Sequence, residues 1–371
     1  MHREAKLTRE YEICTRCVMD TTDPEITFDD KGICNHCTNY LELLDKHILS
    51  EPEKTTSLKR LISKIQEKGK NKEYDAILGV SGGVDSTYMA FKAKELGLRP
   101  LAVHLDNGWN SKLAVSNIER VLKRIDVDLY THVIDWEEFK DLQLAYFKAS
   151  VVDIEAITDH AIVAEIYNTA VRHGIKYIIS GYNLATEGIL PKSWVWNKMD
   201  AVNIRDIHRR FGTKKLETFP LMGFPKYAYL RKIRGYKSIQ LLNYLDYNRA
   251  KAKQFLIDDF GWEDYGGKHH ESLFTKFYQA YVLPRKFNID KRKAHLSTLI
   301  LSGQITREDA LKTLKEPLYD ERDLKRDKEY VLKKFGLTEN EWENLMALPI
   351  RQHDEFKTDQ RVRRLLLMFR S

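Results

Sequence analysis

The most informative shortage in this 371-residue chain is that of cysteine: there are four, and all lie between residues 14 and 37. Long apolar runs are missing as well. No stretch approaches the length that crosses a bilayer, and the first ten residues, MHREAKLTRE, carry charges where a signal peptide needs an apolar segment. We therefore expect a cytoplasmic globular protein without a membrane span. The chain also lacks internal repeats and low-complexity tracts.

Acidic residues do not dominate the chain, because the formal net charge is +7. The basic residues crowd into the second half, as in RRFGTKK (209–215) and PRKFNIDKRK (284–293). This distribution suits an acidic substrate or a nucleic acid equally well, and a solvated basic face explains it without any ligand. Charge alone does not decide between these alternatives.

The four cysteines form two C-x-x-C motifs, CTRC and CNHC, with sixteen residues between them. This spacing predicts a four-thiolate zinc ribbon with the ligands Cys14, Cys17, Cys34 and Cys37. A pair of disulfides and an iron–sulfur cluster are the alternatives, and disulfides are rare in the cytoplasm. We expect His36, between the last two ligands, to be a bystander. A closed Cys₄ site has a structural or docking role, because no coordination position is open for catalysis.

A loop rich in glycine and hydroxyl groups follows the first apolar strand, in YDAILGVSGGVDSTYMA (74–90). The apolar pattern predicts a strand over 74–80 and a helix that ends before Gly97. A strand-to-helix turn binds anions, because free N–H groups and the helix dipole favour negative charge there. The loop matches neither the Walker lysine motif nor G-x-G-x-x-G, and Asp85 requires a divalent cation beside any phosphate. We expect a Mg²⁺-polyphosphate site; a glycine-rich turn without a ligand is the alternative.

Three further strands are predicted, over 100–106, 129–134 and 176–181, with helical stretches between them. Strands that alternate with helices indicate an α/β fold with a doubly wound parallel sheet, whose ligands bind beyond the carboxyl ends of the strands. We divide the chain into a zinc ribbon (1–50), a helical connector (51–72), a catalytic domain (73–245) and a helical C-terminal region that binds substrate (246–371).

The motif SGGVDS (81–86) resembles the PP-loop of ATP pyrophosphatases, which include asparagine, GMP and NAD synthetases and the tRNA thiolases. The resemblance implies that ATP is cleaved to pyrophosphate and that AMP is transferred to the substrate. It also implies that Asp85 and Glu187 hold Mg²⁺, that adenine contacts the backbone of Val103 and His104, and that Asp106 lies near the ribose. The nucleotide-binding residues implied in this way are Val80, Ser81, Gly82, Gly83, Val84, Asp85, Ser86, Thr87, Val103, His104, Asp106, Gly181 and Asn183.

The position of the cysteines also narrows the reaction. The tRNA thiolases generally need further cysteines in the catalytic domain, and this chain has none outside the two motifs. A fused glutaminase would need a nucleophilic cysteine as well. Sulfur transfer is therefore disfavoured, and ammonia would have to come from a separate glutaminase subunit.

Other polar residues have plain structural explanations. We expect Thr158 to cap a helix with Asp159 in its first turn, although a substrate-facing Asp159 stays open. Asp153 and Glu155 are interpreted as a solvated stretch. Trp194 and Trp196 are weak candidates for stacking on a sugar ring, with core packing as the alternative.

The segment KHHES (268–272) follows two glycines and has three explanations. Adjacent histidines are poor metal ligands, because they point in different directions. A surface helix start is the plain explanation. The functional one places Lys268 over the α phosphate, where it would neutralise charge in the adenylation transition state.

Taken together, CTRCVMD, ITFDDKGICNHC, SGGVDSTY, HLDNGW, GYNLATEG and the run from YGGKHHES to SGQITREDAL resemble the N-acetyl sugar amidotransferases of surface polysaccharide and flagellin-glycan synthesis. The resemblance extends from the ribbon to about residue 350. It implies an ATP-dependent conversion of an acetamido group into an acetamidino group, through an adenylated imidate that ammonia displaces. The catalytic residues implied are Asp85, Glu187 and Lys268.

The same resemblance implies an acidic diacetamido sugar substrate, nucleotide-linked or a nonulosonic acid. It also implies a separate glutaminase resembling that of histidine biosynthesis, together with a cyclase-like barrel that conducts ammonia. Two other classes stay open: a tRNA-modifying adenylating enzyme and a non-catalytic nucleotide-binding adaptor. Nucleic acid is the less favoured partner.

Overall fold

The computed structural model describes residues 10–47, 51–267 and 271–368. Its centre is a five-stranded sheet in the order β3-β2-β1-β4-β5, and every neighbouring pair is parallel. The strands are β1 (Ala76–Gly79), β2 (Pro100–Asp106), β3 (Leu129–Val133), β4 (Tyr177–Ile179) and β5 (Lys237–Ile239). The predicted doubly wound parallel sheet is confirmed. The sequence pattern missed β5, which has only three residues.

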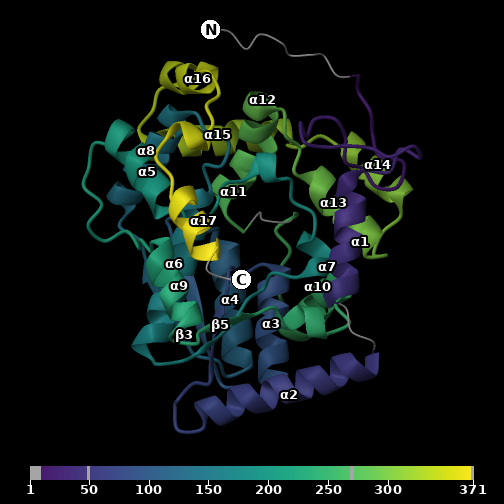
Figure 1. The fold of residues 1–371 in the computed structure, drawn as a ribbon. Helices are drawn as coiled ribbons and strands as arrows, with labels where there is room; N and C mark the ends of the chain where they lie inside the picture. The colour runs from purple at the N-terminus through teal and green to yellow at the C-terminus, as the bar shows by residue number, and fades with distance from the viewer. Residues whose placement is uncertain (1–9, 48–50, 268–270, 369–371) are drawn as a thin grey trace.

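Alternate residues of β1 face opposite layers of helices, as the period of a strand requires. Ala76 and Leu78 pack in one apolar cluster with α2, α3 and α10, whereas Ile77 packs in another with α6 and α9. Figure 1 shows these layers on the two sides of the sheet. The helices concerned are α2 (Glu51–Gly69), α3 (Val84–Glu95), α6 (Ala156–Arg172), α9 (Phe224–Lys232) and α10 (Arg249–Phe260).

The remaining elements complete the two sheet layers and build a helical C-terminal part. They are α1 (Asn35–His47), α4 (Lys112–Arg124), α5 (Trp136–Ala149), α7 (Leu184–Glu187), η1 (Lys192–Trp194), α8 (Ala201–Phe211), η2 (Leu241–Tyr244), α11 (Leu273–Phe277), the π-helical turn η3 (Tyr278–Val282), α12 (Leu283–Phe287), α13 (Arg292–Leu301), α14 (Arg307–Lys315), α15 (Glu321–Phe335), α16 (Glu339–Ala347), η4 (His353–Glu355) and α17 (Gln360–Met368).

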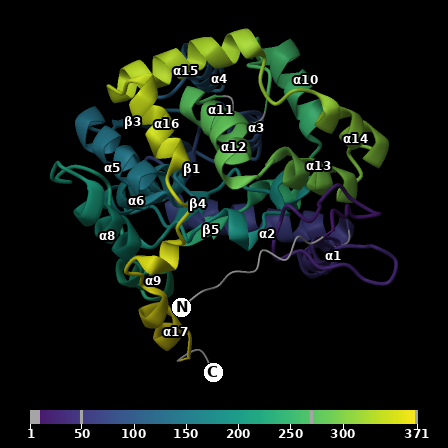
Figure 2. The same cartoon turned by 90° about the horizontal axis from the view of Figure 1, so that it is seen from above.

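The N-terminal cysteine module packs against the C-terminal helices α13 and α14, as Figure 2 shows from above. Arg307 of α14 donates hydrogen bonds of 2.9 Å to the carbonyls of Cys14 and Cys17. Lys293 of α13 forms an ion pair with Asp20, whose side chain is fully buried. Residues 14–20 are therefore held by elements nearly three hundred residues away.

Two expectations about the segment before α6 are wrong. The helix begins at Ala156 with Glu155 in the capping position, so Thr158 lies inside it and is not the cap. Asp153 and Glu155 are not solvated: their residues are 3% and 9% exposed. Asp153 is buried because it pairs with Lys198 at 2.6 Å and accepts the amide hydrogen of Trp196.

Trp194 and Trp196 pack against other side chains and are not among the residues that line the main cavity described below. Trp194 is 2% exposed and belongs to the largest apolar cluster. Trp196 stacks on the ring of His353, with centroids 4.9 Å apart. The alternative that both contribute to packing is the correct one. Among the described residues, no helix combines the length and the apolar character needed to cross a membrane.

Candidate active site

The loop between β1 and α3 is closed by its own hydroxyl groups. Ser86 Oγ accepts from the amide of Ser81 at 3.2 Å and donates to the carbonyl of Gly83 at 3.2 Å, and Ser81 Oγ accepts from the amide of Gly83 at 3.3 Å. Gly82 has φ +85°, and a Cβ there would lie 2.7 Å from the carbonyl oxygen of Ala114. The short side chains thus fix a tight turn at the N-terminus of a twelve-residue helix, which is the arrangement that binds phosphate.

Asp85 lies in the first turn of α3 and is held from two sides. Thr186 Oγ1 donates to one of its carboxylate oxygens at 3.1 Å, and the Tyr247 hydroxyl donates to the other. Burial and the charge of Asp85 raise the pKa of Tyr247 above its ordinary range, so this phenol stays protonated and remains a donor. Glu187, at the end of α7, lines the same cavity as Asp85. Two carboxylates beside a phosphate loop are a suitable ligand set for Mg²⁺.

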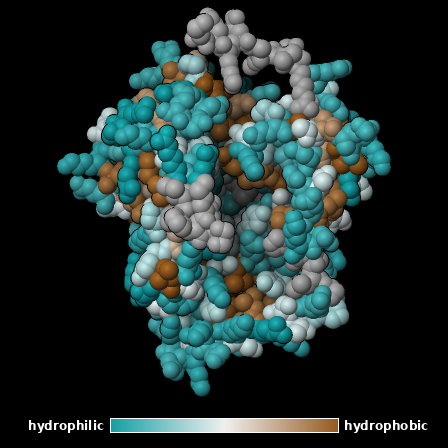
Figure 3. Space-filling view, viewed as in Figure 1, coloured by the Kyte–Doolittle hydropathy of each residue, from teal (hydrophilic) through white to brown (hydrophobic). Residues whose placement is uncertain are grey.

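A cavity of about 500 Å³ opens from this loop. Part of its lining is apolar and comes from Ile162 and Ile166 of α6 together with the strand residues Val103 and Ile178. Gly79 makes the wall close-fitting, since a Cβ there would lie 2.8 Å from Ile166. Polar residues between 271 and 291 also line the cavity. Figure 3 shows that the surface in the view of Figure 1 is mostly hydrophilic and is hollowed near its middle.

The polar part of the cavity lining comes from residues that are far apart in the sequence. Glu155, 9% exposed, accepts a 2.5 Å hydrogen bond from Thr275 Oγ1 and one of 3.3 Å from Gln279 Nε2. Lys291 lines the cavity here and Arg249 lines it near the loop. Neither of these cations makes a side-chain hydrogen bond or a close ion pair with any described residue.

Most of the predicted nucleotide-binding residues line the cavity. They are Val80, Ser81, Gly83, Val84, Asp85, Ser86, Val103, His104 and Gly181. His104 also ties the end of β2 to the loop, because its ring nitrogens hydrogen-bond the Val80 carbonyl at 2.9 Å and the Asn110 side chain at 3.1 Å.

Four predicted residues are not among those that line the cavity. The carbonyl of Gly82 accepts a hydrogen bond from the Trp262 indole at 3.1 Å, and Thr87 is buried in α3. Asp106 holds the turn after β2 by accepting the amide hydrogen of Gly108 at 2.8 Å. Asn183 caps α7 and is fully buried, so it positions the helix that carries Glu187. The predicted Lys268 lies outside the described residues.

Sequence reasoning missed several residues that line the cavity: Glu155, Glu165, Arg249, Tyr265, Gln279 and Lys291. No sequence motif marks Glu155 as a cavity residue, and the acidic residues near it in the sequence suggested that its side chain is solvated. Lys291 was concealed in the basic run PRKFNIDKRK, and no local pattern distinguishes it from its neighbours. Only the folded chain separates the cavity residues from those on the surface.

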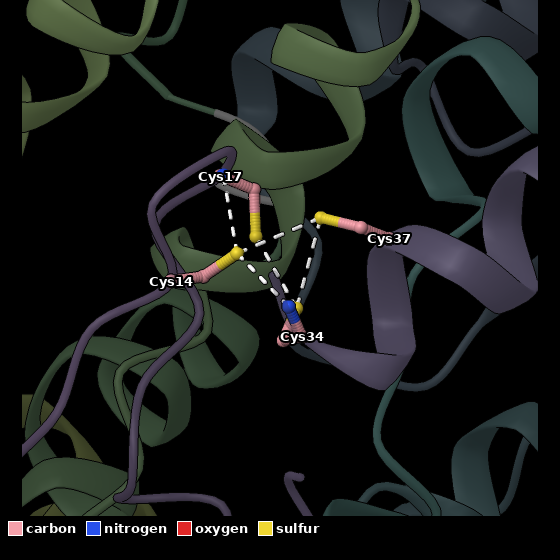
Figure 4. Close-up of side chains that lie close together, drawn as sticks. All are labelled: Cys14, Cys17, Cys34 and Cys37. Carbon is pink, nitrogen blue, oxygen red and sulfur yellow. Dashed lines mark hydrogen bonds between the residues drawn. The ribbon is translucent and has the colours of Figure 1, made fainter. Parts of the chain in front are cut away.

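The four cysteines come together at the N-terminal module, as Figure 4 shows. Their ligand atoms lie within 4.8 Å of one another and all four residues are buried. The sulfur–sulfur separations are 3.7 Å for Cys14–Cys37, 3.6 Å for Cys17–Cys34 and 3.7 Å for Cys34–Cys37. A disulfide would need about 2.05 Å, whereas a tetrahedral ion with bonds of about 2.3 Å places its sulfurs about 3.8 Å apart. The geometry therefore fits one metal ion and excludes the disulfide alternative. His36 instead contacts Asp23 at 2.7 Å, as a bystander would.

The polar lining residues of the cavity between 271 and 291 belong to a segment that matches a known family model. Residues 271–369 match the model of the LPS biosynthesis protein WbpG-like, C-terminal domain. The chain has a WbpG-like C-terminal domain. This match supports the resemblance to proteins of surface-polysaccharide synthesis over residues 271–369. The WbpG-like domain supplies Thr275, Gln279 and Lys291, so the cavity lies between this domain and the loop at 81–86.

Among curated proteins, an uncharacterized protein of Methanocaldococcus jannaschii, MJ1599, is 25% identical over 316 residues, covering 82% of this chain and 93% of that protein. Similar solved structures include the NMN synthetase of Francisella tularensis (17% identity, 62% of this chain and 93% of that chain, TM-score 0.31). The NH3-dependent NAD synthetase of Campylobacter jejuni has 16% identity, 78% and 98% coverage and a TM-score of 0.32. The U34-tRNA thiolase NcsA of Methanococcus maripaludis has 13% identity, 81% and 88% coverage and a TM-score of 0.33.

Proposed function

We propose that the chain is an ATP-dependent amidotransferase of lipopolysaccharide or related glycan synthesis. It would convert the acetamido group of an acidic diacetamido sugar into an acetamidino group, with AMP and pyrophosphate as products. The observation that carries this proposal is a single cavity enclosed by the SGGVDS loop, two carboxylates and the WbpG-like domain.

The cavity residues suit an adenylation. The hydroxyl-rich loop at 81–87 would bind the β and γ phosphates, and the apolar wall of α6 and the strand ends would receive the adenine. Asp85 and Glu187 would hold Mg²⁺, which supplies charge neutralisation for the phosphates. An amide oxygen is a poor leaving group; transfer of the adenylyl group of ATP to this oxygen, with release of pyrophosphate, would allow ammonia to displace it as AMP.

The cysteine cluster is proposed to hold Zn²⁺ in a structural role. Four thiolates fill a tetrahedral shell and leave no position for a substrate. Arg307 and Lys293 connect the module to the WbpG-like domain. The metal would thus support the substrate-binding half of the protein from outside the cavity.

Ammonia is proposed to come from a separate glutaminase subunit, similar to that of histidine biosynthesis and accompanied by a cyclase-like barrel. All four cysteines are committed to the cluster, so the chain has no thiol for glutamine hydrolysis. We also propose that the reaction takes place in the cytoplasm, where ATP is available.

The test is incubation of the purified chain with ATP, Mg²⁺, a high ammonium concentration and candidate sugars. A nucleotide-linked diacetamido uronic acid and a diacetamido nonulosonic acid are the probes. Mass spectrometry should find AMP together with a sugar in which NH replaces O. Formation of ADP and orthophosphate by an active preparation would overturn the proposal.

The Asp85→Asn variant should lose AMP formation, because it removes a proposed Mg²⁺ ligand. Asp128→Asn is the matched control. Asp128 lies before β3, at the opposite end of the strands, where it accepts a hydrogen bond from the Tyr74 hydroxyl at 2.9 Å. This control should keep the activity of the unmodified chain.

A further inference from the structure

We propose that Glu155 is a catalytic base of the amination step, taking a proton from the nitrogen that attacks the activated substrate. The inference rests on the proposed amidotransferase function and extends it. It assigns a role to a residue that has no recognisable sequence motif.

The geometry places a buried carboxylate at the polar end of the cavity. Glu155 precedes α6 and lines the cavity while only 9% exposed. Each of its carboxylate oxygens accepts one hydrogen bond from a neutral donor of the WbpG-like domain, Thr275 on one and Gln279 on the other. A carboxylate oxygen has two acceptor positions, so each retains capacity for a further donor. The side chain is thus fixed in direction and still able to receive a proton.

Glu165, another buried carboxylate that lines the cavity, is already engaged by a charged group. Glu165 accepts hydrogen bonds from Arg172 at 3.3 Å and from Thr169 at 3.1 Å, with His132 at 3.8 Å. Asp85 is held at the phosphate loop by the Tyr247 and Thr186 hydroxyls. Glu155 therefore differs from Glu165 in having only neutral hydrogen-bond donors.

The charged and titratable groups around Glu155 come from three directions. Asp159 lies one turn along the same helix, Asp153 lies just before it, Tyr278 comes from η3 and Lys291 precedes α13. Burial raises the pKa of Glu155 above its ordinary value, Lys291 opposes the increase and Asp159 adds to it. A base with a raised pKa is better matched to proton transfer near neutral pH.

The step balances as follows. The lone pair of ammonia forms the new C–N bond with the imidate carbon, and the nitrogen becomes cationic. Glu155 accepts one proton from that nitrogen, and the C–O bond breaks with its electron pair remaining on AMP. The carboxylate then returns its proton to the amidine product, which leaves as an amidinium ion.

The decisive experiment separates adenylation from amination in the intact chain. Without ammonium, exchange of labelled pyrophosphate into ATP, dependent on the sugar probe, reports adenylation. With ammonium, formation of the amidino sugar reports the complete reaction. Glu155→Gln keeps the size and hydrogen-bonding capacity of the side chain but removes the base. We expect exchange close to that of the unmodified chain and product formation lower by about 100-fold or more.

The controls distinguish a catalytic role from a structural one. Glu138 is also 9% exposed but lies away from the cavity, where Thr218 and Phe219 hold it. Glu138→Gln should leave the ratio of amination to exchange unchanged, whatever its effect on stability. Glu155→Asp should recover part of the amination rate that Glu155→Gln loses. The fall in amination rate that follows protonation of Glu155 at acidic pH should be present in the unmodified chain and absent in Glu155→Gln.

Two outcomes would overturn the assignment while the proposed function stands. The first is a Glu155→Gln variant in which both amination and exchange keep the rates of the unmodified chain, and the second is an equal loss of both activities in a variant that remains folded. If the unmodified chain yields neither exchange nor AMP with any sugar probe, the proposed function itself fails. These results are distinguishable because they come from different proteins in the same assay.

Discussion

Lowering the pH should destabilise the fold through His160, a buried histidine whose two ring nitrogens are both committed. Nδ1 lies 2.7 Å from the carbonyl oxygen of Lys198 and must donate to it, while Nε2 accepts the amide hydrogen of Met222 at 3.0 Å. The residue is fully buried. A second proton would therefore remove the Met222 hydrogen bond and place a charge in the interior, so the neutral form is strongly favoured.

The magnitude follows from the pKa of His160, which burial lowers from 6.5 to about 4. A pKa that is lower in the folded state than in the unfolded chain contributes stability that is fully present above pH 6.5 and is lost as the pH falls toward 4. The shift corresponds to about 3 kcal/mol at most, and to about 2 kcal/mol between pH 7 and pH 5.

The assay is urea unfolding at pH 7 and pH 5, for the unmodified chain and for His160→Gln. The unmodified chain must be compared with His160→Gln because Asp200 changes the free energy of unfolding with pH in the opposite direction. Burial raises its pKa to about 6, so its contribution to stability improves as the pH falls. We expect the unmodified chain to lose about 2 kcal/mol more than the variant over this range.

A second buried histidine provides an independent measurement. Burial lowers the pKa of His353 to about 4, and its ring lies 2.9 Å from the Asn203 side-chain oxygen. His353→Gln should reduce the pH dependence by a similar amount. The reasoning is refuted if both variants, when folded, lose as much stability between pH 7 and pH 5 as the unmodified chain.

Three further predictions concern the phosphate loop and the cysteine module. Gly82→Ala should abolish the ATP binding that calorimetry measures, because Gly82 has a positive φ and the new Cβ would lie 2.7 Å from the Ala114 carbonyl oxygen. A normal affinity for ATP would contradict the proposal that this loop binds phosphate. Lys293→Met should lower the free energy of unfolding by about 3 kcal/mol, since it leaves the buried Asp20 without its cation, and the double variant with Asp20→Asn should recover part of that loss. Cys34→Ser should reduce the bound zinc measured by atomic emission well below one ion per chain; unchanged zinc content would rule out the Cys₄ site.

Local sequence patterns determined the parts of the site whose chemistry is itself local. The strand, loop and helix around residues 81–87 were predicted together because apolar periodicity and loop composition act over a few residues. The expected strand over 100–106 coincides with β2. The cysteine spacing likewise predicted a cluster, since each C-x-x-C motif supplies two ligands from one turn.

Only the tertiary structure decided which polar residues face the cavity. Glu155 read as a solvated residue, yet its hydrogen bond to Thr275 crosses 120 positions of the sequence. The Tyr247 hydroxyl reaches Asp85 across 162 positions, and Trp194 is buried by the core around it. Burial depends on elements that come together from distant parts of the chain, and no window of neighbouring residues contains that information.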